Sequence, residues 1–189
     1  GKPINDIHMI QSLNRTATLW HDLETMKVPG IESVYMPPEA CGRFWAIVSV
    51  RQKYPGHSNH VGNAVIASTT GHYGVKGVIT VDHDIQADDW DRVMWALSTR
   101  FDPKRSAQII DRGRSTVLDP GLPIDERKIT SRILLDACTP YEWEDKPNEI
   151  FMDREVLQKV SDRWSEYGFE GSSPVADMID RLTKPEEIK

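Results

Sequence analysis

Residues 78–103 read VITVDHDIQADDWDRVMWALSTRFDP, and this stretch decides the fold class. Its first four residues are a short β-branched run of the kind that lies buried in a parallel sheet. The acidic cluster Asp82-His83-Asp84, called the acidic knot below, ends this predicted strand. A helix is predicted next, with Asp88 as its N-cap and Asp102-Pro103 as its end. Five residues form the apolar face of this helix: Trp90, Val93, Met94, Leu97 and Phe101.

The segments on both sides continue this alternation of strands and helices. Apolar spacing predicts a helix over 7–24, and strands are expected over 33–36, 44–50 and 133–135. Another helix should follow Pro55-Gly56, with Ser58 or Asn59 as its cap. A strong helix over 153–168 begins at Asp153 and should bury Val156, Leu157, Val160 and Trp164. The order predicts an α/β fold: a mixed, largely parallel sheet flanked by helices, with a C-terminal helical extension.

Composition narrows the class of protein. The chain has 189 residues, 39% hydrophobic and 28% charged, which fits one globular domain over residues 1–170 with a weakly helical or mobile tail over 171–189. A net charge of −6 argues against nucleic-acid binding, which needs a basic face. Only two cysteines and no apolar run of membrane-spanning length favour a reducing, cytoplasmic compartment. The chain begins Gly1-Lys2-Pro3 without a methionine, so we expect part of the native protein to be missing.

The acidic knot has two interpretations. Ligands in open α/β sheets collect beyond the carboxyl ends of strands, and carboxylates with an imidazole could bind a divalent metal there. Adjacent residues on an extended segment point to opposite sides, however, so the favoured interpretation is a polar joint at the start of the next helix. His57 and His60 have a spacing that suits a metal, but helix capping and surface polarity are favoured for them.

Basic residues offer further candidate sites. Arg112 and Arg114 lie in DRGRSTVLDPGLP, where a turn-rich loop is expected and a guanidinium could grip a carboxylate or phosphate. A solvated loop is the alternative for both residues, and Arg43 has the same ambiguity. Lys76, just before the strand at 78–81, suits a phosphate contact or an ordinary edge-strand lysine. No nucleophile elbow and no glycine-rich phosphate loop is present, so no complete active site is predicted from the residues alone.

Several ordered motifs resemble those of the UbiD-type decarboxylases. VDHDIQADDWDRVMWALSTRFDP, over 81–103, is similar to the family's acidic D-D-I/V segment followed by W-A-x-x-T-R-x-D-P. PPEACGRFWAIVSVRQKYPGHSNHV, over 37–61, is similar to P-E-G-G-R-x-x-A-V-V-S-I-x-x-x-Y-P-G-H. SRILLDACTPYEW, over 131–143, is similar to K-x-x-x-D-A-T-x-P-x-E. The resemblance runs from about His8 to Phe169 and corresponds to the C-terminal portion of the family.

The resemblance implies a cofactor and a division of labour. Members use prenylated FMN with a divalent metal (Mn or Mg) and K to decarboxylate, or sometimes carboxylate, aromatic or α,β-unsaturated acids. Their catalytic residues and metal ligands lie in preceding sequence, so no catalytic residue and no metal ligand is assigned here. By position, Arg114 and Lys76 are expected to bind the cofactor, and Thr116 and Leu118 to line the substrate pocket. Thr116 stands where some family members have an aromatic residue, and Thr70 stands near the position of a lysine that reaches the cofactor phosphate in some members.

Residues 1–170 should therefore form a C-terminal domain that mediates oligomerisation, as a dimer or hexamer, and closes over the active site. Its partners would be the missing N-terminal and flavin-binding domains, with an aromatic acid and CO2 as substrate and product, and neither nucleic acid nor membrane. Alone, the domain should be inert. One alternative is a stand-alone assembly or scaffold subunit of a carboxylase complex. Another is a metal hydrolase that uses Asp82, His83 and His57.

Overall fold

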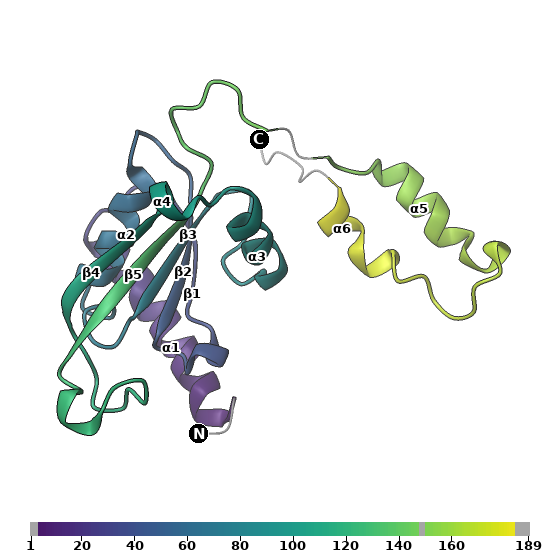
Figure 1. The fold of residues 1–189 in the computed structure, drawn as a ribbon. Helices are drawn as coiled ribbons and strands as arrows, with labels where there is room; N and C mark the ends of the chain where they lie inside the picture. Colours follow the sequence, from purple (N-terminus) through teal and green to yellow (C-terminus); the bar gives the residue numbers. More distant parts are fainter. Residues whose placement is uncertain (1–3, 148–149, 184–189) are drawn as a thin grey trace. The chain divides into compact units, whose positions relative to one another are not determined.

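The computed structural model describes residues 4–147 and 150–183 (Figure 1). The chain divides into two compact units, residues 1–144 and 145–189. The boundary predicted at residue 170 falls inside the second unit, and residues 184–189 of the predicted tail lie outside the described part. Among the described residues, no helix has both the length and the apolar character needed to cross a membrane.

The first unit is built on one five-stranded sheet. Its strands are β1 (Ile31–Tyr35), β2 (Trp45–Val50), β3 (Gly77–Asp82), β4 (Ala107–Arg114) and β5 (Ile129–Ala137). Their order across the sheet is β1-β2-β3-β5-β4. The central strands β2, β3 and β5 are parallel, whereas β1 and β4 pair antiparallel at the edges. The mixed, centrally parallel sheet confirms the predicted α/β class.

Helices cover both faces of this sheet (Figure 1). They are α1 (Asp6–Thr25), α2 (His57–Ala67), α3 (Trp90–Thr99) and the short α4 (Pro103–Ser106). Alternate residues of each central strand point to opposite faces. Val48 and Val78 therefore join the core beneath α1 and α2, while Ile79 joins the separate core beneath α3. Two cores on opposite faces of one sheet make a three-layer unit.

Two predicted N-cap residues are wrong, although each lies within a few residues of the observed N-cap. The N-cap of α3 is Asp89, whose side chain accepts the amide of Arg92, and not Asp88. The N-cap of α2 is Gly56, in the left-handed conformation with a φ of 75°, and no side chain caps this helix. Ser58 consequently lies inside the first turn, where its hydroxyl donates to Asp136 across the unit. Glycine reaches this conformation without steric cost, which moves the helix start ahead of the expected cap.

Strand β4 is the strand of the sheet that the sequence did not predict. Residues 107–114 pair antiparallel with β5, so Arg112 and Arg114 belong to a strand and not to a loop. A register shift between Ile110 and Gly113 places Arg112 at a φ of 61°. Most side chains of this edge strand are exposed, so its residues do not show the apolar alternation by which a half-buried strand is recognised.

Helix α3 is only partly buried. Val93 and Ala96 are fully buried against the sheet, but Trp90 is 51% exposed and Met94 is 44% exposed. The predicted apolar face is therefore divided between the core and a groove of about 590 Å³, called the α3 groove below. Its apolar lining includes Tyr35, Trp45, Ile79, Trp90, Met94 and Leu97.

The second unit is small and helical. Helix α5 (Arg154–Asp162) begins at Asp153, whose carboxylate accepts the amides of Glu155 and Val156, which confirms the predicted cap. Three short helical segments follow: η3 (Trp164–Tyr167), η4 (Ala176–Met178) and α6 (Ile179–Leu182). Leu157 and Ile179 are buried, whereas Val156 is 58% exposed. The predicted burial of Val156 is wrong because only one side of α5 packs against this unit's few other elements.

Candidate functional site

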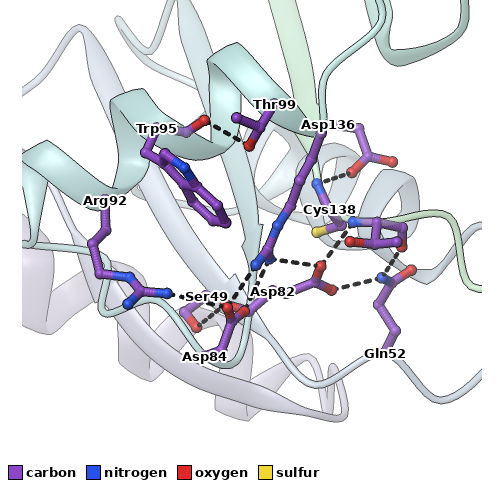
Figure 2. A network of polar contacts seen from close by, with 11 residues as sticks. Ser49, Gln52, Asp82, Asp84, Arg92, Trp95, Thr99, Asp136 and Cys138 are labelled. Atoms are coloured by element: carbon purple, nitrogen blue, oxygen red, sulfur yellow. Dashed lines mark hydrogen bonds and ion pairs between the residues drawn. The ribbon is translucent and has the colours of Figure 1, made fainter. Parts of the chain in front are cut away.

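The acidic knot is a salt-bridged joint at the carboxyl end of β3 (Figure 2). Asp82 accepts a hydrogen bond from Arg100 Nη1 at 3.0 Å and another from the amide of Thr139 at 2.7 Å. Its second oxygen accepts from Gln52 Nε2 at 2.8 Å. Asp84 accepts from Arg100 Nη2 at 2.7 Å. Arg100 therefore holds both carboxylates of the knot at the end of α3.

A tryptophan supports the guanidinium groups around the knot. Arg92 Nη2 lies 3.4 Å from Asp84 Oδ2, and the Arg92 and Arg100 guanidinium carbons lie 5.6 and 4.9 Å from the Trp95 ring centroid. Cation–π contacts of this kind hold a guanidinium in place beside its carboxylate. The acidic charge is thus balanced by neighbouring arginines, as an architectural joint requires. Among residues 4–147 and 150–183, no three His, Cys, Asp or Glu side chains are placed to hold a metal together.

The two helical histidines have separate partners. His57 is fully buried, its Nδ1 accepts the amide of Lys53 at 3.1 Å, and its ring lies 4.2 Å from that of Tyr54. His60 Nδ1 lies 2.7 Å from the Tyr54 hydroxyl. His83, the imidazole of the acidic knot, is by contrast exposed. Each of the two helical histidine rings thus has its own polar partner within the chain.

Burial lowers the pKa of His57 below its ordinary value of 6.5. The unfolded chain therefore binds a proton at this position more readily than the folded chain does. The stability that neutral His57 contributes is complete above pH 6.5 and is lost as the pH falls through the lower folded pKa. We expect the melting temperature to fall between pH 7.5 and pH 5, and His57→Asn to lose most of that slope. Thermal denaturation across this pH range measures the dependence of the melting temperature on pH. The control variant H83N should keep the wild-type dependence.

A polar cavity of about 290 Å³ lies beside the carboxyl ends of β3 and β5. Part of its polar lining is paired internally: Ser58 Oγ donates to Asp136 at 2.5 Å, and the amide of Cys138 donates to the same carboxylate at 3.0 Å. Burial raises the pKa of the Cys138 thiol well above its usual value. The thiol therefore stays protonated and unreactive. This cavity has the expected position of an α/β ligand site, and its Asp136 carboxylate is already paired within the chain.

The residues implicated by resemblance gather elsewhere, on two segments that we call the loop edge, residues 70–76 and 114–121. Arg114, at the end of β4, extends beside His72 and Tyr73. Its Nη1 lies 3.1 Å from His72 Nε2, and its guanidinium carbon lies 4.9 Å from the Tyr73 ring centroid. Arg114 is exposed and has no carboxylate partner in the described part of the chain. It is thus a positioned cation that can still receive an anion.

Thr116 and Leu118 follow on the second segment of the loop edge. Thr116 is buried, and its methyl group lies 3.5 Å from the position that a Cβ on Gly74 would take. Its hydroxyl accepts the amide of Leu118 at 3.3 Å. Leu118 is 62% exposed. The structure therefore places an outward apolar side chain four residues from Arg114, on a turn that Thr116 stabilises from inside.

Lys76 is already paired on the same edge. Its Nζ donates to Asp119 Oδ1 at 2.8 Å and lies 5.5 Å from the Phe44 ring centroid. The Asp119 side chain is 1% exposed, and that of Lys76 is 31% exposed. Burial opposes ionisation of Asp119, but hydrogen bonds from Lys76 and Gly121 outweigh it and lower the pKa of the carboxyl. Asp119 is thus a buried carboxylate that Lys76 stabilises.

A buried arginine supports the edge from beneath. Arg132, on β5, is 4% exposed and donates through Nη2 to the carbonyls of His72 and Arg114 and through Nη1 to that of Ile66. It has no carboxylate partner among the described residues, and burial lowers its pKa. Each carbonyl hydrogen bond to the charged group offsets part of its desolvation. Arg132 consequently joins the two segments of the loop edge through their main chains.

Reasoning from the sequence missed three residues of this edge, His72, Tyr73 and Asp119, and also missed Arg132, which supports the edge from β5. No local spacing pairs Lys76 with Asp119, because 43 residues separate them. The available signal was weak. Buried charges need partners, so Asp119 within the turn-rich STVLDPG stretch and Arg132 within the apolar SRILL run were each candidates for a distant partner.

The comparisons with known proteins agree on one family. Residues 8–137 match the model of the 3-octaprenyl-4-hydroxybenzoate carboxy-lyase C-terminal domain. The UbiD-class enzyme HmfF from Pelotomaculum thermopropionicum, in complex with FMN, is 25% identical, with a TM-score of 0.68 over 81% of this chain and 32% of that one. The open form of Sedimentibacter hydroxybenzoicus vanillic acid decarboxylase is 26% identical, with a TM-score of 0.73 over 87% and 36%.

An evolved dimeric form of HmfF in complex with prFMN is 25% identical, with a TM-score of 0.53 over 71% of this chain and 27% of that one. The chain thus spans about a third of the length of these proteins. The match over residues 8–137 contains the whole sheet, both of its helical layers and the loop edge, and HmfF shares the fold. The chain belongs to the UbiD family, as a C-terminal domain of that family.

Proposed function

We propose that this chain is the C-terminal domain of a reversible decarboxylase of aromatic or α,β-unsaturated acids that uses prenylated FMN. The observation that carries the proposal is the loop edge, where Arg114 presents a positioned cation four residues before the exposed Leu118. Both residues are among those that the resemblance implicates. A guanidinium can hold a carboxylate or phosphate in bidentate fashion, and an adjacent apolar side chain suits an aromatic acid.

The loop edge fits one side of a flavin site. Arg114 is free of carboxylate partners within the described residues and would face an acid or a phosphate, while Leu118 would line the pocket. When bound, prenylated FMN supplies the covalent chemistry of CO2 exchange. We place the ligands of the divalent metal and of K in the remainder of the protein. This chain's own contribution is to bind, orient and exclude water.

Closure of the domain over the active site is part of the same proposal. HmfF is described in complex with FMN and its evolved form in complex with prFMN, and the vanillic acid decarboxylase is described in both an open and a closed form. A domain that closes over a flavin removes water from the reaction and completes the pocket. The two free cysteines, Cys41 and Cys138, support a reducing, cytoplasmic setting for this chemistry.

Comparison of this chain with the full-length protein tests the proposal. The full-length protein should retain flavin through purification and release CO2 from an aromatic or α,β-unsaturated acid. This chain alone should do neither. Absorbance spectra of the bound flavin and a CO2-release assay on both proteins measure these outcomes. Tight flavin binding or decarboxylation by the isolated chain would show that the division of labour is wrong, and a full-length protein without flavin would reject the function.

We also propose that the α3 groove binds a second copy of this chain. Trp90 and Met94 are large, exposed and adjacent to the partly buried rings of Tyr35 and Trp45. Contiguous apolar surface of this kind marks an interaction site, and buried tryptophans dominate the energy of such interfaces. An evolved form of one relative is described as dimeric, and we therefore choose a second copy of this chain as the occupant.

Trp90→Glu should weaken self-association of the full-length protein by at least about tenfold, since it places a charge in an apolar interface. Native mass spectrometry at a series of protein concentrations measures the shift toward monomer. Ile124→Glu is the matched control, because Ile124 is 83% exposed and lies outside the groove. An unchanged oligomer for W90E would locate the subunit interface on another surface.

A further inference from the structure

We infer that Lys76 acts on this site as a positioning residue, through its ion pair with Asp119, and does not bind the flavin phosphate. The inference deepens the proposed function and rests on it, because it assigns the role of one residue at the same site. We call the Lys76–Asp119 pair the edge clamp. It joins the sheet to the turn that carries Thr116 and Leu118.

The sheet side of the clamp is rigid. The amide of Lys76 donates to the carbonyl of Phe44 at 2.8 Å, and its carbonyl accepts the amide of Ile133 at 2.7 Å. Lys76 is therefore fixed by main-chain hydrogen bonds to both neighbouring segments at the start of β3. The side chain extends from this fixed base to Asp119.

The loop side of the clamp depends on Lys76. Asp119 also accepts the amide of Gly121 at 2.9 Å and lies 3.5 Å from Ser115 Oγ, while its own amide donates to the carbonyl of Thr116 at 3.0 Å. The carboxylate thus organises the turn from residue 115 to residue 121. Lys76 is the sole cation that contacts it in the described part of the chain.

Competition disfavours a phosphate ligand that would draw the Lys76 ammonium away from Asp119. If the Lys76 ammonium turned away toward a phosphate, the Asp119 carboxylate, 1% exposed, would remain buried without its cation. An uncompensated buried charge is strongly unfavourable, and this free-energy cost would weaken flavin binding. Within the described parts of the chain, Arg114 has no such competing carboxylate. The two cations of the edge therefore have different tasks: Arg114 contacts an anion, and Lys76 holds the turn.

The full-length enzyme tests this assignment with four variants: Lys76→Met, Asp119→Asn, the double variant, and Lys76→Arg as the charge-conserving replacement. Both single variants should raise KM for the acid by on the order of tenfold, because a small misplacement of the pocket wall weakens substrate positioning. They should change kcat less and leave flavin retention within about twofold. The double variant should be no worse than either single one, since the two residues act as a unit. K76R should recover most of the wild-type KM.

Hydrogen exchange of residues 115–121 gives a readout that needs no activity. Exchange there should be faster in K76M and D119N than in wild type and unchanged in Lys104→Met, which removes an exposed lysine elsewhere. The inference is overturned if K76M loses flavin at least about tenfold more readily while D119N retains it, because Lys76 would then be a phosphate ligand. It is also overturned if exchange at 115–121 does not change. A wild-type enzyme without flavin or activity would refute the proposed function and leave the exchange test of the clamp intact.

Discussion

Arg100→Met should lower the free energy of unfolding by about 3 kcal/mol, because it leaves the two carboxylates of the acidic knot without their shared cation. The side chain of Arg100 is only 12% exposed, so water compensates little of the loss. For a chain of this size, the melting temperature should fall by about 6–12 °C. Denaturant titration and thermal melting measure both quantities.

A surface ion pair provides the control for this prediction. Arg51 and Glu32 lie 2.8 Å apart with side chains 55% and 35% exposed. Arg51→Met should therefore cost less than about 0.5 kcal/mol. If R100M lowered the free energy of unfolding as little as R51M, the knot would not be the joint between β3 and α3. Arg100→Lys should lie between the two variants, because a lysine keeps the charge but not the fork that reaches both carboxylates.

Gly71→Ala should be the most damaging small substitution in the chain. A Cβ at this position would lie 1.7 Å from the carbonyl oxygen of Val65, which is backbone and cannot rotate away. The loop that carries His72 and Tyr73 must then shift, and the hydrogen bond from the Gly71 amide to Ser68 Oγ is lost with it. We expect a loss of about 3 kcal/mol or more in denaturant titration.

Gly62→Ala is the matched control. Its Cβ would lie 3.3 Å from Leu134 Cδ1, the end of a flexible side chain, and alanine favours the helical conformation. This variant should stay within about 1 kcal/mol of wild type. The contrast extends to the loop edge: only G71A should accelerate hydrogen exchange of residues 70–76. Equal stability of the two variants would mean that the chain does not follow the described path from Val65 to Gly71.

The local sequence pattern was sufficient to predict the central elements of the fold. The β-branched run at 78–81 and the helical spacing from Trp90 to Leu97 predicted β3 and α3, because both signals depend on residues that are near in sequence. Edge strand β4 was missed, since its exposed residues become a strand only by pairing with β5. The exposure of Trp90 and Met94 was missed for a related reason: the extent to which the sheet covers α3 is not a property of the helix.

The residues of the candidate site also divide into those that the sequence predicted and those that it did not. Arg114, Thr116, Leu118 and Lys76 were named from motif resemblance, and the structure brings all four to one edge; their roles stay predictions. Asp119 and Arg132 were not found, because what marks them is burial beside partners tens of residues away.

The sequence by itself determined the α/β class, the family and the segments that carry the candidate residues, since periodicity and ordered motifs are local properties of the chain. Only the tertiary structure decided which charges meet: Arg100 with the knot, Arg132 with two loop carbonyls and Lys76 with Asp119. The physical reason is that ion pairing depends on distance in space and on exclusion of water. Both are created when the strands and helices pack together.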